Sequence, residues 1–387
     1  MDFNFTKEEK LLQNSVREYI KDKIAPVVLE EDKKAPLSKK EAAAFLKDLI
    51  KFGYIGPFVQ AENNGPELSK VEAGIIFSEL GKAWASLAAI AVFHSNAISL
   101  ILNSKNNQLI KKFVPSLMSG EIIGSAACTE PLAGSDISGI QTTAYPRSDK
   151  YIVNGTKTWA ANGSVADIAL IAAKIDQTGI DKNNLALFLV EKKNSCFETI
   201  ETPKMGLKAL STAKLVLKDF PVTKDNILII HEELENRHDW RSFLQKEEKC
   251  LTAAISLGIA EASLEAAVSY SKQRMQFGKR LAEFQMIQKM IAEMAVSLDA
   301  AKFLTFRALK MLDEGVPCYK EIIMAKTFAA QTAVEAASKA IQIHGAYGYS
   351  DELPVERYYR DANCFAILDK STELQELEIA KEVLGFK

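Results

Sequence analysis

The hydrophobic pattern of this chain changes twice along its length, and this change limits the folds that the chain can adopt. Apolar residues recur at helical spacing from Lys7 onward, give way to short β-rich runs after Glu121, and return to long amphipathic helical patterns after Lys246. We therefore expect a mainly α protein with a small central β-domain. The expected units are an N-terminal α-helical domain (1–120), a middle β-domain (121–230) and a C-terminal four-helix bundle (231–387).

The composition excludes several classes of protein. With 387 residues the chain is long enough for about two to three domains with a sizeable core. Its formal net charge of −2 and its lack of a basic block argue against nucleic-acid binding. The cysteines are odd in number and form no Cys-x-x-Cys pair, so we expect reduced thiols in the cytoplasm and no zinc site. They are Cys128, Cys196, Cys250, Cys318 and Cys364.

Neither a membrane span nor a metal site is predicted. The longest apolar stretch, residues 83–102, is interrupted by a histidine, a serine and an asparagine and is expected to be a buried helix. The N-terminus is polar, so no secretory leader is expected. Residues 227–244 are polar and are expected to form a surface loop or a short helix. They include two histidines and several acids, but the spacing matches no known metal-ligand pattern.

A tight Pro/Gly turn is the first candidate for a ligand site. Residues 129–136 read Thr-Glu-Pro-Leu-Ala-Gly-Ser-Asp and follow an apolar run. Gly134 lets the backbone approach a ligand closely, and Thr129, Ser135 and the turn amides can donate hydrogen bonds. Such a turn can cradle a flat polar ligand. By itself the same sequence also suits an ordinary Asx-rich turn.

Further motifs follow this turn in a fixed order. Residues 157–163 read Lys-Thr-Trp-Ala-Ala-Asn-Gly after a predicted strand and an Asn-Gly turn, residues 274–279 read Arg-Met-Gln-Phe-Gly-Lys, residues 342–348 read Gln-Ile-His-Gly-Ala-Tyr-Gly, and residues 354–362 read Pro-Val-Glu-Arg-Tyr-Tyr-Arg-Asp-Ala. In this order and spacing the five motifs resemble the acyl-CoA dehydrogenase family of flavoenzymes, and the resemblance covers essentially the whole chain. Five ordered motifs are far more specific than any one of them.

The resemblance implies one FAD per chain in a site shared between subunits. The turn and the Trp159 segment would hold the isoalloxazine ring, and the later Arg and Gln motifs would bind the ADP half of a neighbouring subunit's FAD. This implies a homo-oligomer, a tetramer by resemblance. Taken singly, Arg274 and Phe277 also suit a helix-capping arginine and a core aromatic residue. The implied cofactor-binding residues are Cys128, Thr129, Gly134, Ser135, Trp159, Ala161, Arg274, Gln276, Phe277, Gln285, Gln342, Gly345, Ala346, Ser371 and Glu373.

The chemistry that the resemblance implies needs one carboxylate. This base removes the acidic α-proton of an acyl thioester while a β-hydride passes to the flavin, and a 2-enoyl thioester results. Most members carry Tyr-Glu-Gly-Thr-Ser with the Glu as base, whereas residues 368–372 here read Leu-Asp-Lys-Ser-Thr. Asp369 is therefore in register with the base. Its side chain is shorter by roughly 1.5 Å, and misplacement by about 1 Å can slow a reaction about a hundredfold.

Glu248 is the second candidate for the base. It lies where isovaleryl- and long-chain-type relatives carry theirs, just before Lys249, which replaces the usual Arg near the thioester. Lys249 and Ser135 are accordingly expected to contact the substrate. The structural alternative for Glu248 is an acid at a helix start, where the helix dipole favours it. Both carboxylates stay candidates, and Asp369 is preferred because its segment aligns without a gap.

Other departures from the family pattern leave alternatives for the reaction. Ala161 replaces the hydroxyl residue that usually meets the flavin, Lys370 replaces a Gly beside the base, and the usual Gly-rich loop before residue 246 is absent. We predict FAD-dependent dehydrogenation of an acyl-CoA or carrier-protein-bound acyl group, as in fatty acid metabolism, with an electron-transfer flavoprotein or another acceptor. The alternatives are a flavin oxidase or monooxygenase on the same fold and a non-catalytic flavoprotein.

Overall fold

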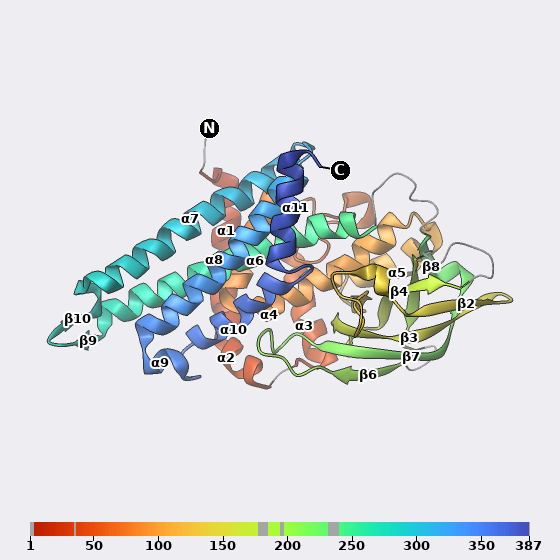
Figure 1. Cartoon of the computed structure of the whole chain (residues 1–387), viewed down its shortest axis with the longest axis horizontal. Coiled ribbons are helices and arrows are strands. Elements are labelled where there is room, and N and C mark those ends of the chain that lie inside the picture. Colours follow the sequence, from red (N-terminus) through yellow and green to blue (C-terminus); the bar gives the residue numbers. More distant parts are fainter. Residues whose placement is uncertain (1–3, 35, 177–184, 194–196, 231–239, 387) are drawn as a thin grey trace.

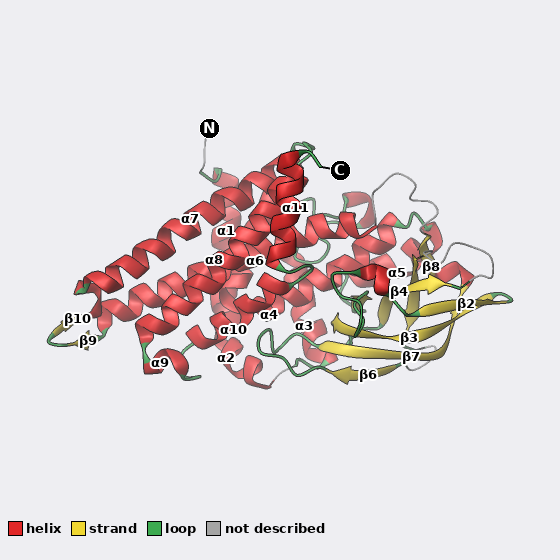
Figure 2. Ribbon diagram, viewed as in Figure 1, coloured by secondary structure: helices red, strands yellow, loops and turns green. Residues whose placement is uncertain are grey.

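The computed structural model describes the chain except for residues 1–3, 35, 177–184, 194–196, 231–239 and 387. Helices come first along the chain, strands follow, and long helices return (Figure 1). The strands of the large sheet lie together at one end of the elongated molecule, the long helices extend away from them, and a short two-stranded ribbon lies at the opposite end (Figure 2). The predicted mainly α fold with a small central sheet is confirmed.

The N-terminal helices begin where the sequence supplies caps. Thr6, Ser38 and Ser69 each accept a hydrogen bond from the backbone N–H three residues on, where a Glu side chain accepts one from the cap's own N–H. These bonds pair N–H groups that a helix start otherwise leaves without partners. The helices are α1 (Lys7–Tyr19), α2 (Ala25–Lys34), α3 (Lys39–Leu49), α4 (Lys70–Asn103) and α5 (Asn107–Met118), and a π-helical turn (Ile20–Ile24) joins α1 to α2.

The long helix α4 lies in the hydrophobic core, which confirms the buried helix predicted for residues 83–102. Both α4 and residues 246–273 of α6 (Trp240–Gln273) are long and apolar enough to cross a membrane, but 89% and 72% of their apolar windows are buried within the protein. Each therefore has the surroundings of a core helix. The backbone of Trp84 leaves helical geometry and kinks α4.

The strands of the middle region form one eight-stranded sheet among the described residues. Its order is β6-β7-β3-β2-β4-β5-β8, and β1 pairs in parallel with β4. Two of the short β-rich runs expected after Glu121, residues 168–173 and 186–190, lie in β4 and β5, which pair with each other and are almost entirely buried. The strands are β1 (Gly124–Ala127), β2 (Thr143–Arg147), β3 (Lys150–Ala161), β4 (Ile168–Ile175), β5 (Leu185–Glu191), β6 (Glu198–Glu201), β7 (Thr212–Thr223) and β8 (Ile227–Ile230).

One predicted turn is wrong. Asn154 and Gly155 lie inside β3, where the pairing with β7 shifts its register at a bulge. The side-chain amide oxygen (Oδ1) of Asn154 accepts a hydrogen bond from the backbone N–H of Asp219 at 2.7 Å, and a Cβ on Gly155 would come within 2.2 Å of the Thr142 hydroxyl. Pairing with β2 and β7 on both sides therefore overrides the local preference of Asn-Gly for a turn.

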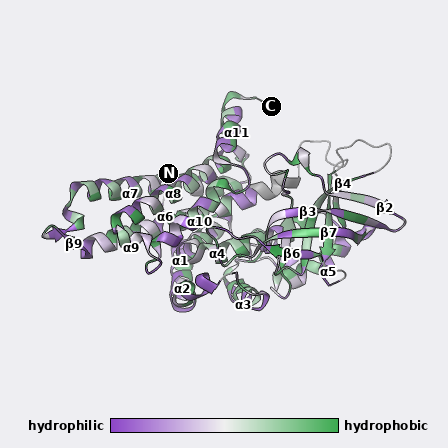
Figure 3. Ribbon diagram, turned by 60° about the horizontal axis from the view of Figure 1, so that its bottom comes forward, coloured by the Kyte–Doolittle hydropathy of each residue, from purple (hydrophilic) through white to green (hydrophobic). Residues whose placement is uncertain are grey.

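The C-terminal helices pack around α6, which contacts α4, α7 and α8. Close packing against α4 depends on two glycines: a Cβ on Gly81 would lie 2.7 Å from the carbonyl oxygen of Ile255, and one on Gly258 would lie 2.2 Å from that of Ser78. The last helix, α11, packs against α8 and projects from the body of the molecule (Figure 3). The remaining elements are β9 (Met275–Gln276), β10 (Lys279–Arg280), α7 (Gln285–Asp313), α8 (Tyr319–His344), α9 (Ala346–Tyr349), α10 (Val355–Ile367) and α11 (Thr372–Leu384).

The polar segment at residues 227–244 differs in part from its prediction. Its first four residues form β8, and α6 begins at Trp240. Residues 231–239 lie outside the described residues, so the predicted loop and the predicted lack of a metal site there stay predictions. Elsewhere, the described part of the chain brings no three potential metal ligands together.

Candidate active site

A cavity of about 210 Å³ lies between the sheet and the helices. It is lined by residues of β1 and the following turn, of β3, β4 and β5, of α4 and α6, and of the segment between α10 and α11. Seven of the residues predicted from the sequence lie here: Cys128, Thr129, Gly134, Trp159, Ala161, Glu248 and Asp369. The others in the lining are Phe93, Asn96, Ala126, Ala127, Ile137, Thr158, Leu170, Leu187 and Leu368.

The sheet side of the cavity is shaped by a bulge in β3. The pairing of β3 with β7 is interrupted between Lys157 and Ala160, and the backbone N–H of Thr158 instead donates to the carbonyl of Thr129 at 2.8 Å. Trp159 has a left-handed backbone (φ +57°), which costs roughly 1–3 kcal/mol for a residue other than glycine. Its side chain is 58% exposed and lines the cavity. The bulge thus presents Trp159 beside the Thr129 turn.

A buried ion pair that sequence reasoning missed lies behind this wall. The Nζ of Lys157 lies 2.6 Å from the carboxylate of Glu130, and both side chains are almost fully buried. Burial opposes the charged carboxylate, but hydrogen bonds from Lys157 and Thr142 lower the pKa of Glu130. Burial lowers the pKa of Lys157 despite its partner. A lysine at the inward-facing spacing of a strand, four residues after the buried Val153, was the signal available in the sequence.

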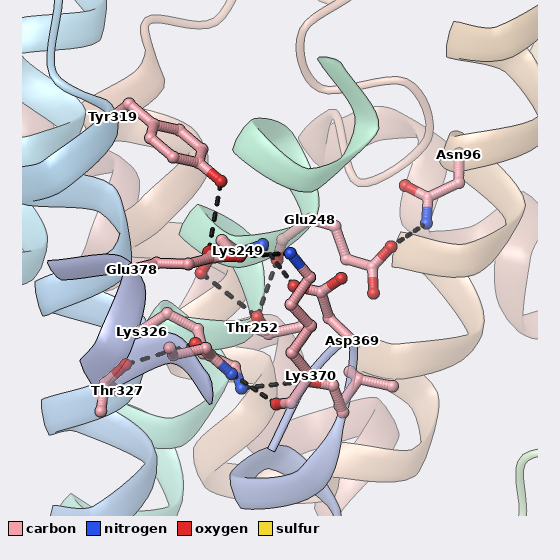
Figure 4. A network of polar contacts seen from close by, with 12 residues as sticks. Asn96, Glu248, Lys249, Thr252, Tyr319, Lys326, Thr327, Asp369, Lys370 and Glu378 are labelled. Carbon is pink, nitrogen blue, oxygen red and sulfur yellow. Dashed lines mark hydrogen bonds and ion pairs between the residues drawn. The ribbon is translucent and has the colours of Figure 1, made fainter. Parts of the chain in front are cut away.

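The helix side of the cavity carries Glu248. Its carboxylate accepts a hydrogen bond from the side-chain amide of Asn96 on α4 at 2.8 Å (Figure 4). Burial raises the pKa of Glu248 to about 7, and the charge of Asp369 acts in the same direction. Because α6 begins at Trp240, Glu248 does not lie in the first turn, and the alternative of a helix-start acid is wrong. Asn96 was not predicted as a site residue.

Asp369 has a different environment. One of its carboxylate oxygens is paired with the ammonium of Lys249, whose side chain is fully buried (Figure 4). Its backbone is left-handed (φ +69°), and the preceding carbonyl, of Leu368, accepts a hydrogen bond from Lys326 at 3.0 Å. Burial lowers the pKa of Lys326 to about 8. Two buried lysines therefore hold the turn that carries Asp369. Lys249 contacts this carboxylate and does not line the cavity.

The remaining predicted residues do not reach the cavity. Ser135 is exposed on the turn, and Ser371 and Glu373 lie at the start of α11. Phe277 is 92% exposed, so its alternative as a core aromatic is wrong. Arg274 directly follows α6, where its backbone N–H donates to the carbonyl of Tyr270 at 2.8 Å, and its guanidinium lies over the ring of Tyr347. A group of exposed residues gathers at the end of the bundle farthest from the sheet (Figure 1): Arg274, Gln276, Phe277, Gln285, Gln342, Gly345 and Ala346.

The distance along α6 separates this group from the cavity. Arg274 follows Glu248 by 26 residues, which is about 39 Å along a helix. The two sets of predicted residues therefore form two separate surfaces of one chain.

The cavity has features that suit a flavin ring. Hydroxyl and backbone groups of Thr129 and Thr158 lie beside the large aromatic face of Trp159, and a Cβ on Gly134 would meet no atom within 4 Å. A flat heteroaromatic ring with polar edges needs such an open, hydrogen-bonding wall. The exposed group around Arg274 and Gln342 provides cationic and amide side chains on a second surface of the chain.

Comparisons with known proteins agree with this geometry. Three family models match in order: acyl-CoA dehydrogenase, N-terminal domain (residues 6–121), middle domain (125–220) and C-terminal domain (244–384). The acyl-CoA dehydrogenase of Bacillus subtilis (strain 168) is 34% identical over 384 residues, which cover 98% of this chain and 99% of the relative.

Two solved structures have the same fold. An acyl-CoA dehydrogenase from Bacillus anthracis, complexed with FAD, matches with a TM-score of 0.89 and 26% identity over 99% of this chain and 67% of that chain. The prolyl acyl carrier protein oxidase AnaB matches with a TM-score of 0.89 and 27% identity over 98% of this chain and 100% of that chain. The predicted identity is thus confirmed: the chain belongs to the acyl-CoA dehydrogenase family and is an FAD-dependent enzyme of the acyl-CoA dehydrogenase type.

Proposed function

We propose that the protein dehydrogenates an acyl thioester, acyl-CoA or carrier-bound, whose Cα and Cβ lie in the 210 Å³ cavity. The observation that carries this proposal is the juxtaposition of the Thr129 and Trp159 wall with the carboxylate of Glu248 across one cavity. Bound FAD supplies the acceptor for the β-hydride. The residues of the chain hold the ring, exclude water and accept the α-proton.

We assign abstraction of the α-proton to Glu248, contrary to the preference for Asp369 drawn from the sequence. A general base works best when its pKa lies near the operating pH, and the pKa of Glu248 is raised to about 7. Asn96 donates to one of its oxygens and orients the carboxylate. Asp369 is held instead by Lys249, so we infer that its charge and position support Glu248.

Two isosteric variants test this assignment. Glu248→Gln is expected to retain FAD and to slow flavin bleaching by substrate about 10²–10⁴-fold, because a general base contributes about that much. Asp369→Asn is expected to retain FAD and to slow bleaching less. Anaerobic stopped-flow with a panel of acyl-CoA and acyl-carrier-protein thioesters measures both. If Asp369→Asn has the larger effect, Asp369 is the base, and if both variants bleach at the parent rate, dehydrogenation through either residue is excluded.

We further propose a homo-oligomer, a tetramer by family resemblance. In it, the exposed surface around Arg274 and Phe277 would complete the FAD site of a neighbouring subunit. The exposure of Phe277 and the separation of about 39 Å from Glu248 along α6 support this arrangement.

We propose an electron-transfer flavoprotein as the electron acceptor. A cytoplasmic location fits the absence of disulfides among the described residues.

One observation favours a second candidate function. Ala161 lines the cavity where most relatives carry a hydroxyl, and the similar AnaB structure is that of an oxidase acting on a carrier-bound prolyl group. An oxidase acting on a carrier-bound acyl group is therefore the alternative. Rapid reoxidation of the substrate-reduced protein by oxygen, with release of hydrogen peroxide, would favour the oxidase. Slow reoxidation that an electron-transfer flavoprotein accelerates would favour the dehydrogenase.

A further inference from the structure

Two buried charges lie directly behind the cavity wall. The side chain of Lys157 has no exposed surface and that of Glu130 is 4% exposed, with 2.6 Å between Nζ and Oε1. Removing two charges from water carries a desolvation penalty that their attraction does not always offset, and an apolar pair of similar size would often be as stabilising. The pair is therefore a costly way to stabilise a strand, and its contacts point to a role in geometry.

These contacts reach each segment of the wall. Lys157 also donates to the carbonyl of Cys128 at 3.0 Å, and Glu130 accepts from the backbone N–H groups of Gln141 at 2.6 Å and Thr142 at 3.0 Å. The residue that follows β1, the turn and the two residues that precede β2 thus converge on one buried ion pair.

The wall residues adjoin the pair in sequence. Thr129 immediately precedes Glu130, and Thr158 immediately follows Lys157; both line the cavity, and a backbone hydrogen bond of 2.8 Å joins them. The left-handed residue Trp159 comes next. The ion pair therefore ties the turn to the bulge from behind, at the place where the β3–β7 pairing no longer supports β3.

We propose that the Glu130–Lys157 pair is a positioning device that holds the Trp159 bulge against the Thr129 turn and so sets the shape of the wall that receives the flavin ring. This inference rests on the proposed placement of the flavin in the cavity. Neither residue lines the cavity, so neither is catalytic. Loss of the pair loosens the wall, weakens FAD binding and alters the surroundings of the ring, while α6 and Glu248 keep their positions.

The test compares Glu130→Gln, Lys157→Met and the double variant in the full-length holoenzyme. The Kd for FAD is measured from the fluorescence of flavin released on dilution, and the ring environment from visible circular dichroism. We expect all three variants to raise the Kd at least about tenfold and to change the dichroism. The double variant leaves no unpaired buried charge, so it is expected to regain the Tm that the single variants lose but not the affinity for FAD.

Glu191→Gln is the matched control. It neutralises another buried carboxylate of the same sheet, at the end of β5, which lies 2.7 Å from the half-exposed Lys112 of α5 and 3.1 Å from the exposed Lys193 and does not line the cavity. This variant is expected to lower the Tm and to leave the Kd for FAD unchanged.

Three outcomes would overturn the inference. If the double variant regains the parental FAD affinity together with its Tm, each residue only neutralises the charge of the other, and the pair does not position the wall. If Trp159→Ala weakens FAD binding but Glu130→Gln behaves like Glu191→Gln, the positioning role fails while the proposed site stands. If Trp159→Ala also leaves FAD affinity unchanged, the flavin does not lie on this wall, and the proposed site fails as well.

Discussion

Single residues of the candidate site differ mainly in what surrounds them. Asp369 and Glu248 line the same cavity, but a buried ammonium engages the first and a neutral amide engages the second. Both carboxylates could be found in the sequence, Asp369 through its motif and Glu248 through its place before Lys249. Their partners could not, because Asn96 and Asp369 approach α6 only through tertiary packing.

The rate of flavin reduction is expected to rise with pH through about 7. Glu248 must be unprotonated to accept the α-proton, and burial together with the charge of Asp369 raises its pKa to about 7. Lys249, Asn96 and Lys326 oppose this shift. Asp369→Asn removes a charge that raises the pKa, so the acidic limb of its profile is expected to move to lower pH. Stopped-flow measurement of flavin bleaching between pH 5 and 9 locates the acidic limb of each profile. An unchanged limb in Asp369→Asn would contradict the coupling.

Lys326 is expected to make stability depend on pH in the alkaline range. Its pKa in the folded protein is lowered to about 8 by burial, from a value of 10.5 when exposed. Between these values the unfolded chain holds a proton that the folded protein has lost, so stability rises with pH over this window. Relative to Lys326→Met, the free energy of unfolding of the parent should rise by up to about 3 kcal/mol between pH 7 and about 10.5. Urea unfolding at several pH values tests this, with the exposed Lys310→Met as control. Parallel curves for parent and Lys326→Met would refute it.

At the scale of elements, the packing of α4 against α6 forms the helix side of the cavity. Asn96 and Glu248 come from these two helices, and Ser99 of α4 likewise donates to Glu247 of α6 at 2.9 Å. These side chains can meet because glycines let the two backbones approach closely at Gly81 and Gly258.

Gly258→Ala is expected to destabilise the protein by about 1–3 kcal/mol or more, because the new methyl group would lie 2.2 Å from the Ser78 carbonyl and the helices would have to separate. Thermal melting and urea unfolding measure the loss. Gly139→Ala, whose Cβ would meet its nearest atom at 3.4 Å, is the control and should change stability little. Equal stability of the two variants would show that the helices do not rely on this contact.

At the scale of the whole molecule, the two groups of predicted cofactor residues lie on separate surfaces of one chain. Arg274 and Phe277 are exposed at the end of the bundle opposite the sheet, and Thr129 and Trp159 line the cavity (Figure 1). In the proposed arrangement, a complete FAD site needs two chains. Exposed apolar side chains on α7, such as Val296 and Phe303, leave further surface for contact between copies.

Subunit mixing is expected to restore FAD binding. Arg274→Ala damages the surface offered to a neighbour, and Trp159→Ala damages the chain's own wall, so each variant alone has only impaired sites. Mixed oligomers contain some sites with neither change. We therefore expect the mixture, after dissociation and reassembly, to bind more FAD per chain than either variant, with light scattering reporting the assembly. A mixture that binds only the average of its components, or a parent protein that is a monomer with full FAD occupancy, would contradict the shared site.

The sequence by itself determined the family, the cofactor and the order of helices and strands in this protein. Capping residues, apolar periodicity and ordered motifs are local properties, and they act over a few residues. Even there, pairing with β2 and β7 kept the Asn154–Gly155 dipeptide inside β3, opposite a bulge of β7. Only the tertiary structure decided which carboxylate is held by a lysine, which is held by an amide, and which buried pair supports the wall. Lys249 meets Asp369 across 120 residues of chain, and the protonation and orientation of such groups depend on burial and on partners that local sequence does not specify.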